Sequence, residues 1–158
     1  MKLIPTTNTN LIKSIMLDED LFYASMMDID IKNFEEGNWE PSPNFTYLLA
    51  KEGSDAVGLV RLHDFTPVAI DVHFSILPKY WGTGVSNKVQ KTLEHWLIDN
   101  TPYIKIITQT PRACEEVIKA QLRNGYQIDV ALPNTTLWRN KVEDLVIMSK
   151  YIRGFQHG

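Results

Sequence analysis

A single cysteine, Cys114, stands among the 158 residues of the chain, so no disulfide can form within it. No apolar run approaches the roughly 20 residues that span a bilayer, and no apolar N-terminal region has the form of a secretory signal. These absences argue against a secreted, disulfide-stabilised protein and against a membrane protein. We expect one domain, residues 1–158, in the reducing environment of the cytoplasm.

An excess of basic charge is also missing. The sequence has 16 Lys and Arg against 19 Asp and Glu, a formal net charge of −3, which argues against broad binding to the phosphate backbone of nucleic acid. Its four histidines lack the spacing of metal ligands, so we expect neither a nucleic-acid partner nor a metal site. Hydrophobic residues at 44% and charged residues at 22% are typical of a soluble globular domain.

Hydrophobic periodicity predicts the order of helices and strands. Strand patterns fall at residues 1–5, 45–51, 56–65, 68–77, 103–110, 126–133 and 143–152, the last two joined through 134–142. Helical spacing falls at residues 11–16 and 85–97. Two further helices are predicted, one after a cap at Asp18 and one begun by Pro111 with Thr110 as its cap. The order β-α-α-β-β-β-α-β-α-β-β predicts an α+β domain with one mixed, mostly antiparallel sheet of about six or seven strands flanked by helices.

Three details of this pattern position the candidate site. Short separators make the strands between 45 and 77 an antiparallel meander, with Gly58 marking a bulge. The helix after Pro111 has an apolar face of Cys114, Val117, Ile118 and Leu122, and ends at Asn124 and Gly125. Residues 28–44 have no sustained periodicity, which predicts a specificity loop whose Trp39 is either a lid or an anchor.

Two of only eight glycines, Gly82 and Gly84, stand just before the helix of residues 85–97. The first N–H groups of a helix lack partners in the helix, so a turn without side chains there is suited to bind an anion. A Walker loop is a poor fit, because no Lys followed by Ser or Thr comes after a later glycine. A dinucleotide loop is a poor fit too, because Asn87 stands where a third glycine is needed.

The stretch "ILPKYWGTGVSNKVQKTLEHWL" resembles the acyl-CoA pyrophosphate loop of the Gcn5-related N-acetyltransferases, the GNAT superfamily. That family's pattern falls on Trp81, Gly82, Thr83, Gly84, Val85 and Ser86. The resemblance runs from about residue 45 to 152, with Asp71 at the usual acidic position of the fourth strand and Asp144 before the last strand. The order of elements found from periodicity is also the order of this family.

The resemblance implies a GNAT fold and transfer of an acetyl group from acetyl-CoA to a primary amine of a small molecule or protein. Coenzyme A would lie where the fourth and fifth strands separate, with its pyrophosphate on the amides of residues 82–86 and its pantetheine along Ile76 and Leu77. Asp71 and His73, two residues apart on one strand face, are the candidates for the base or water relay. The resemblance leaves open whether the protein is a monomer or a homodimer.

Gln121 keeps a second hypothesis open. It stands where many members of the family carry a Tyr that protonates the leaving thiolate, and a Gln side chain cannot serve as that acid. The alternative is a weakly active or inactive GNAT-fold binding protein, of the kind that tailed bacteriophages use in head assembly or counter-defence. These small phage proteins are similar to the chain in size and in the "H-x-x-x-x-P" end of the fourth strand. A nucleotide-binding module, suggested by the glycines alone, is a third possibility.

Overall fold

A computed structural model describes residues 1–29 and 39–154 of the chain. Its elements are β1 (Lys2–Thr6), α1 (Thr9–Met16), α2 (Glu19–Ser25), β2 (Thr46–Glu52), β3 (Asp55–Thr66), β4 (Ala69–Ile76), the 3₁₀ turn η1 (Pro78–Tyr80), α4 (Val85–Asn100), β5 (Lys105–Pro111), α5 (Glu115–Arg123), β6 (Gln127–Trp138) and β7 (Lys141–Tyr151). The predicted order of helices and strands is confirmed among these residues.

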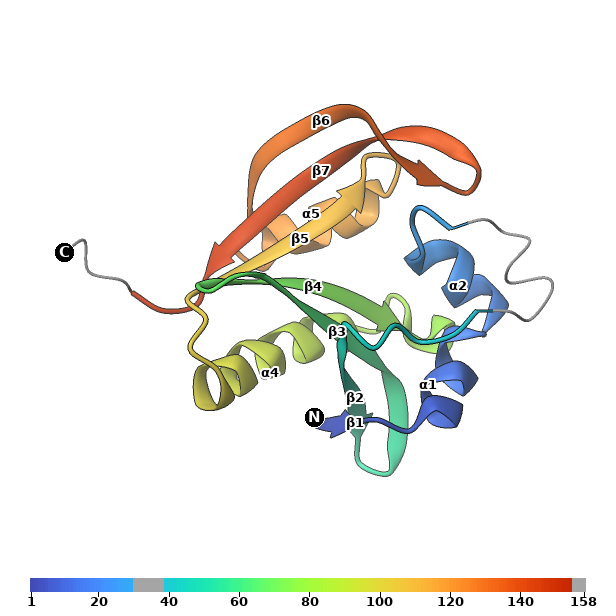
Figure 1. Ribbon diagram of the computed structural model, residues 1–158. Helices are drawn as coiled ribbons and strands as arrows, with labels where there is room; N and C mark the ends of the chain where they lie inside the picture. The colour runs from blue at the N-terminus through green and yellow to red at the C-terminus, as the bar shows by residue number, and fades with distance from the viewer. Residues whose placement is uncertain (30–38, 155–158) are drawn as a thin grey trace.

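The seven strands form one sheet in the order β1-β2-β3-β4-β5-β7-β6 (Figure 1). β4 and β5 run parallel, whereas the other neighbouring strands run antiparallel, as the short separators require for β2, β3 and β4. The predicted mixed, mostly antiparallel sheet and its central meander are therefore confirmed. The registers place Arg61 of β3 opposite His73 of β4.

Helices cover both faces of the sheet, and two hydrophobic clusters mark the two layers. On one face, α4 buries Val85, Val89, Leu93 and Leu97 against Val60, Val72, Ile106 and Met148 of the sheet. On the other, α1 and α2 bury Ile12, Ile15, Met16, Leu21 and Phe22 against Leu49 and Leu59. The predicted cap at Asp18 is confirmed, because its carboxylate accepts the N–H of Leu21 at 3.1 Å. Among the described residues, no helix combines the length and apolarity needed to cross a membrane.

Of two predictions about the region after residue 103, one is wrong and one holds in part. Thr110 does not cap a helix: it lies in β5 opposite Val146, and α5 begins at Glu115 after Cys114. The predicted apolar face of α5 is right at its centre, where Ile118 packs against the core, but Val117 and Leu122 at its edges are 48% and 46% exposed. Gln121 lies on the same face as Ile118 and is buried, so the buried stripe includes a polar residue that a pattern of hydrophobic residues leaves out.

The connection predicted over residues 134–142 is also wrong. β6 continues to Trp138, and β7 begins at Lys141, so a two-residue turn of Arg139 and Asn140 joins them. Both turn residues have positive φ angles, 50° and 61°, the combination that a tight β-hairpin requires. The sequence lacks the usual Asn-Gly signal there, so the turn was not visible from local composition.

Gly58 lies beside an irregularity in the pairing of β2 with β3, where the register shifts between Ala50 and Lys51. The predicted bulge is therefore present next to it. A Cβ atom on Gly58 would lie 2.2 Å from the carbonyl oxygen of Ser75 in β4. The glycine is thus required by the close approach of two backbones.

Replacing Gly58 with Ala is expected to destabilise the fold, because the clash is with backbone of β4 and the two strands would have to separate. We expect the free energy of unfolding, measured by urea denaturation, to fall by about 3 kcal/mol, the upper end of the usual cost of overpacking. Gly53→Ala is the control: Gly53 has φ of +62° but no atom within 4 Å of an added Cβ. Equal losses in the two variants would contradict the proposed clash.

Candidate functional site

β4 and β5 separate soon after they begin to pair, and this opens the sheet at its centre. Their parallel pairing covers Ala69–Asp71 with Lys105–Ile107, although β4 continues to Ile76 and β5 to Pro111. Figure 1 shows the two strands diverging toward their C-terminal ends. The divergence leaves one edge of β4 from Val72 to Ile76 without a strand partner in the described sheet.

The backbone of β4 presents alternate residues to this open edge. The N–H of Leu77 donates to the carbonyl oxygen of Val57 at 2.9 Å, so the amide of Leu77 points toward β3. Because backbone groups alternate between the two edges of an antiparallel strand, those of Phe74 and Ile76 point into the opening. The carbonyl oxygen of Ile76 accepts a hydrogen bond from the indole Nε1 of Trp81 at 2.7 Å. Trp81 thus holds the end of β4 against the turn that follows it.

The glycine turn lies at the wide end of the opening, between η1 and α4. Gly82 and Gly84 have φ angles of +73° and +83°, the left-handed region that glycine adopts most readily. No atom lies within 4 Å of a Cβ built on either residue, so the turn is open to solvent. Thr83 fixes its shape by donating its hydroxyl hydrogen to the carbonyl oxygen of Tyr80 at 2.6 Å.

The amides of this turn are suited to hold an anion. Gly84 is the N-cap of α4, and the first turn of the helix closes when Lys88 N–H donates to the Gly84 carbonyl at 3.4 Å. The N–H groups before Lys88 have no acceptor within the helix, and the helix dipole adds partial positive charge there. Val85 is buried in the core, so its contribution is limited to its amide, whereas Ser86 remains partly exposed.

Asp71 and His73 lie at the narrow end of the opening and contact each other. The Nε2 atom of His73 is 3.0 Å from Oδ2 of Asp71, and Gln109 of β5 donates to the same oxygen at 3.2 Å. Asp71 is buried, and its Oδ1 has no partner among the described residues. When Nε2 carries the proton donated to Asp71, Nδ1 of His73 has a lone pair and can accept a proton. The two sequence-predicted catalytic residues are therefore brought together.

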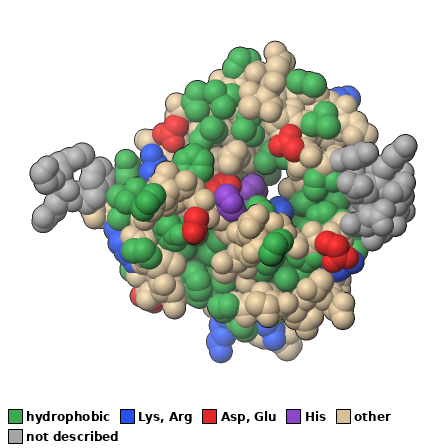
Figure 2. Space-filling model, viewed as in Figure 1, with side chains coloured by type: hydrophobic (Ala, Val, Ile, Leu, Met, Phe, Trp, Pro, Cys, Tyr) green, Lys and Arg blue, Asp and Glu red, His purple; other side chains and the backbone are tan. Residues whose placement is uncertain are grey.

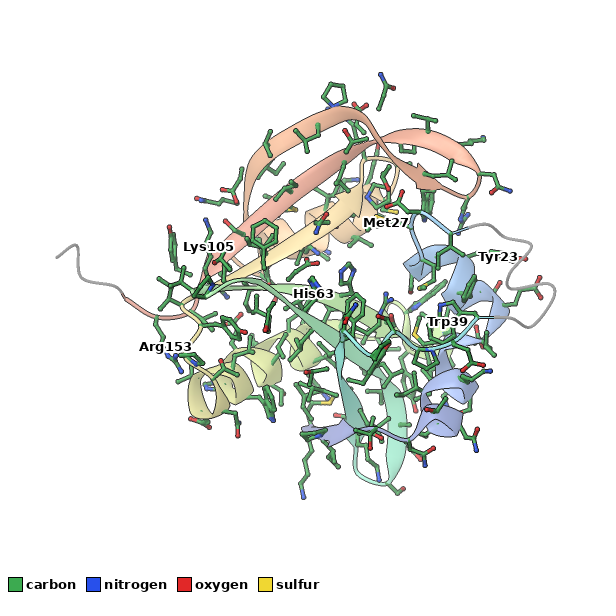
Figure 3. The ribbon with its side chains drawn as sticks, viewed as in Figure 1. Tyr23, Met27, Trp39, His63, Lys105 and Arg153 are labelled. Atoms are coloured by element: carbon green, nitrogen blue, oxygen red, sulfur yellow. The ribbon has the colours of Figure 1, made fainter. Side chains whose placement is uncertain are left out.

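A cavity of about 340 Å³ meets the opening at His73 and Gln109. Its described lining comes from the end of α2, the segment before β2, and the sheet: Ser25, Met26, Met27, Asp28, Ile29, Trp39, Glu40, Ser42, Phe45, Tyr47, Arg61, His73 and Gln109. Figure 2 shows this face hollowed near its centre, with histidine side chains beside the hollow. In Figure 3, His63 lies at the centre of the view, and Met27 and Trp39 lie on the side of α2.

The sequence predicted some residues of this cavity and missed others. Trp39 is an anchor: its side chain is buried and packs edge-on against Phe22. The rest of the predicted specificity loop, residues 30–38, lies outside the described residues. Arg61 and Gln109 were missed, although an Arg inside the apolar run of residues 57–62 was a visible signal. Among the described residues, no three His, Cys, Asp or Glu side chains gather to hold a metal ion.

Gln121 is buried and contacts the part of β5 that does not pair with β4. Its Oε1 accepts the hydroxyl hydrogen of Thr108 at 2.8 Å. This hydrogen bond joins α5 to β5 in a region where both polar groups are removed from water, so neither is left without a partner. The position that a Tyr acid would take is therefore used for packing and hydrogen bonding.

Comparisons with known proteins identify the fold. No protein-family model and no curated protein sequence matches the chain. Among solved structures, spermidine N-acetyltransferase from Vibrio cholerae in complex with CoA and spermine is similar at a TM-score of 0.75, with 10% identity over 95% of this chain and 94% of that chain. The yncA protein from Salmonella typhimurium, solved with its cofactor acetyl-CoA, gives 0.72, with 13% identity over 100% and 98% of the two chains.

A third solved structure, smu.2055 from Streptococcus mutans UA159, gives a TM-score of 0.70, with 13% identity over 97% of this chain and 100% of that chain. At such identities the similarity is one of fold. The chain has the GNAT fold, as the resemblance of its glycine turn and its order of elements implied.

Proposed function

We propose that the chain is an acetyl-CoA-dependent N-acetyltransferase that moves an acetyl group to a primary amine. One observation carries the proposal: the opening between β4 and β5 has an open glycine turn and a helix start at one end, and a paired Asp71–His73 with a cavity at the other. A long donor with phosphates at one end and a reactive thioester at the other is suited to such an opening, and the cavity is suited to an acceptor.

Coenzyme A fits the residues on the wide side of the opening. Its pyrophosphate would accept hydrogen bonds from the amides of Gly82 and of residues 84–86, where no side chain of Gly82 or Gly84 interferes, whereas the amide of Thr83 already donates to the carbonyl oxygen of Tyr80 at 3.3 Å. Its pantetheine arm would lie along Phe74 and Ile76, whose backbone groups face the opening like an edge strand. Acetyl-CoA supplies the activated acetyl thioester. The amide of Leu77 already donates to Val57 and its carbonyl oxygen accepts the N–H of Tyr80 at 2.9 Å, so Leu77 would contribute through its side chain.

The acceptor would react from the cavity. Its amine nitrogen attacks the thioester carbonyl, so an N–C bond forms, the C–S bond breaks and coenzyme A leaves as the thiolate. His73 accepts the proton that the amine loses, while Asp71 orients the imidazole and stabilises its charged form. The thiolate takes a proton from water in this scheme, because Gln121 is not an acid.

A second candidate function is favoured by Gln121 alone. A GNAT-fold protein that binds coenzyme A without efficient transfer, such as the phage-type assembly or counter-defence proteins, needs no acid for the leaving thiolate. In this chain the hydrogen bond between Thr108 and Gln121 occupies that position. The two candidates share the binding turn and differ in turnover.

Titration calorimetry with acetyl-CoA, CoA and ATP separates these hypotheses. We expect both CoA species to bind with similar affinity and ATP to bind much more weakly, because the open edge of β4 favours a pantetheine arm. Thiol release with a panel of amines then reports turnover. Binding without turnover supports the second candidate, and ATP binding equal to that of CoA supports a nucleotide module. Failure of both CoA species to bind eliminates the acetyltransferase proposal.

A further inference from the structure

Arg61 places a buried cation in the wall of the acceptor cavity. It lies on β3 opposite His73, so the two side chains share one face of the sheet. The residue is only 6% exposed, and burial lowers the pKa of its guanidinium to about 10. Burying an ion is costly unless other groups satisfy it, so the partners of Arg61 decide what it is for.

The partners of Arg61 among the described residues are weak. Nη1 is 3.3 Å from the thioether sulfur of Met26, a poor acceptor, and Nη2 is 3.5 Å from the carbonyl oxygen of Ser25. Its guanidinium carbon lies 5.8 Å from the centre of the Phe45 ring. Nε has no partner, and no described carboxylate lies within ion-pair distance of Arg61. A guanidinium has five N–H donors, so the described residues leave most of its capacity unused.

The acidic groups around the described part of the cavity have partners other than Arg61. Asp71 bonds through its Oδ2 to His73 and Gln109, Glu40 pairs with Lys13 at 2.6 Å, and Asp28 accepts hydrogen bonds from Thr136 and Leu137. The remaining described lining is largely aromatic, aliphatic or thioether. The described part of the cavity therefore combines an apolar wall with a cation, Arg61, that no described carboxylate pairs, close to the proposed base.

We propose that the acceptor is a small amino carboxylate with an apolar side chain, whose carboxylate is bound by Arg61 while its amine faces His73. The planar guanidinium matches a carboxylate through two parallel hydrogen bonds. A polyamine is disfavoured, since it would bring another cation against Arg61. This inference rests on the proposed function, because it names the acceptor class of the same site.

The test compares acceptors that differ in the carboxylate. Thiol release from acetyl-CoA is measured with L-phenylalanine and L-methionine, with their amides, with 2-phenylethylamine and with spermidine. We expect kcat/KM for the acids to exceed that for the neutral and polycationic amines by about 10- to 100-fold, the worth of a hydrogen bond to a charged group. The α-amino groups of the amides are less basic than those of the acids, so a larger share of them is unprotonated and reactive. A preference for the acids therefore cannot come from amine reactivity.

Two substitutions assign the preference to Arg61. Arg61→Gln and the apolar Arg61→Met should abolish the preference for acids over 2-phenylethylamine, through a higher KM for the acids. Arg123→Gln, on the exposed last turn of α5, is the matched control and should retain the preference. Neither Arg61 variant is expected to unfold, because a poorly paired buried cation contributes little stability. Thermal unfolding checks this point.

A binding experiment keeps this inference separate from the proposed function. 3-Phenylpropionate has a carboxylate and no amine, so it cannot react, and its binding to the protein with CoA present is measured by calorimetry. Binding that Arg61→Gln weakens at least tenfold supports the carboxylate site even without turnover. Efficient acetylation of amides, phenylethylamine or spermidine at the rate of the acids overturns the inference and leaves the acetyltransferase proposal standing. Unchanged 3-phenylpropionate binding in both Arg61 variants also overturns it.

Discussion

Replacing Gly84 with Asp is expected to weaken binding of CoA by at least about 100-fold, because like charges placed together cost several kcal/mol. Gly84 caps α4 in a left-handed conformation, with φ of +83°. An Asp carboxylate at that position would lie beside the amides that are proposed to hold the pyrophosphate. It would occupy these donors and repel the ligand. Titration calorimetry with CoA measures the loss.

The fold should survive this substitution. No atom lies within 4 Å of a Cβ on Gly84, and Asp tolerates the left-handed region better than most residues, at a cost of about 1–2 kcal/mol. Asp at the start of a helix also interacts favourably with the helix dipole. The matched control is Gly53→Asp in the turn between β2 and β3, where φ is +62° and the space is equally open. It should bind CoA like the unmodified protein. Retained affinity in Gly84→Asp would show that the pyrophosphate binds elsewhere.

Replacing His73 with Gln is expected to lower kcat by about 100- to 1,000-fold, the range typical of a lost general base. The Gln amide can still donate to Asp71, so the carboxylate keeps a partner and the buried pair is not left half satisfied. The affinity for acetyl-CoA should stay within about threefold, because the proposed donor contacts lie on β4 beyond this residue and on the glycine turn.

Two other histidines serve as comparisons. His95 is exposed on α4, and His95→Gln should leave kcat unchanged. His63 is more informative, because it lies opposite Asp71 in the pairing of β3 with β4 and its ring is 5.3 Å from Phe45. If His63→Gln loses as much activity as His73→Gln, the two act together. If His63→Gln alone loses activity, the assignment of the base to His73 is wrong.

The sequence was sufficient to predict the structure wherever interactions between residues close together in the chain determine it. Period-two and helical spacing predicted every described strand and helix in order, and the short separators predicted the antiparallel meander. Asp18 caps its helix because its carboxylate reaches an amide three residues ahead. Gly82 and Gly84 predicted an open turn because few other residues adopt their backbone conformation without strain. The strand position of Asp71 and His73 likewise predicted that their side chains share a face.

The sequence-based predictions failed at positions whose structure is determined by contacts between residues far apart in the chain. Thr110 was assigned to a helix cap because its pairing with β7 is not visible locally, and the buried hydrogen bond of Gln121 was not predicted because its partner Thr108 lies on another element. Arg61 was passed over for the same reason.

The sequence by itself therefore determined the elements, their order, the open glycine turn and the likeness to a GNAT fold. The tertiary structure decided that β4 and β5 pair over only three residues and then separate, that Asp71 meets Gln109 across the opening, and that Arg61 faces the cavity. Propensities and turn residues act over a few neighbours along the chain, whereas the opening and its charge arise from how distant strands and helices pack.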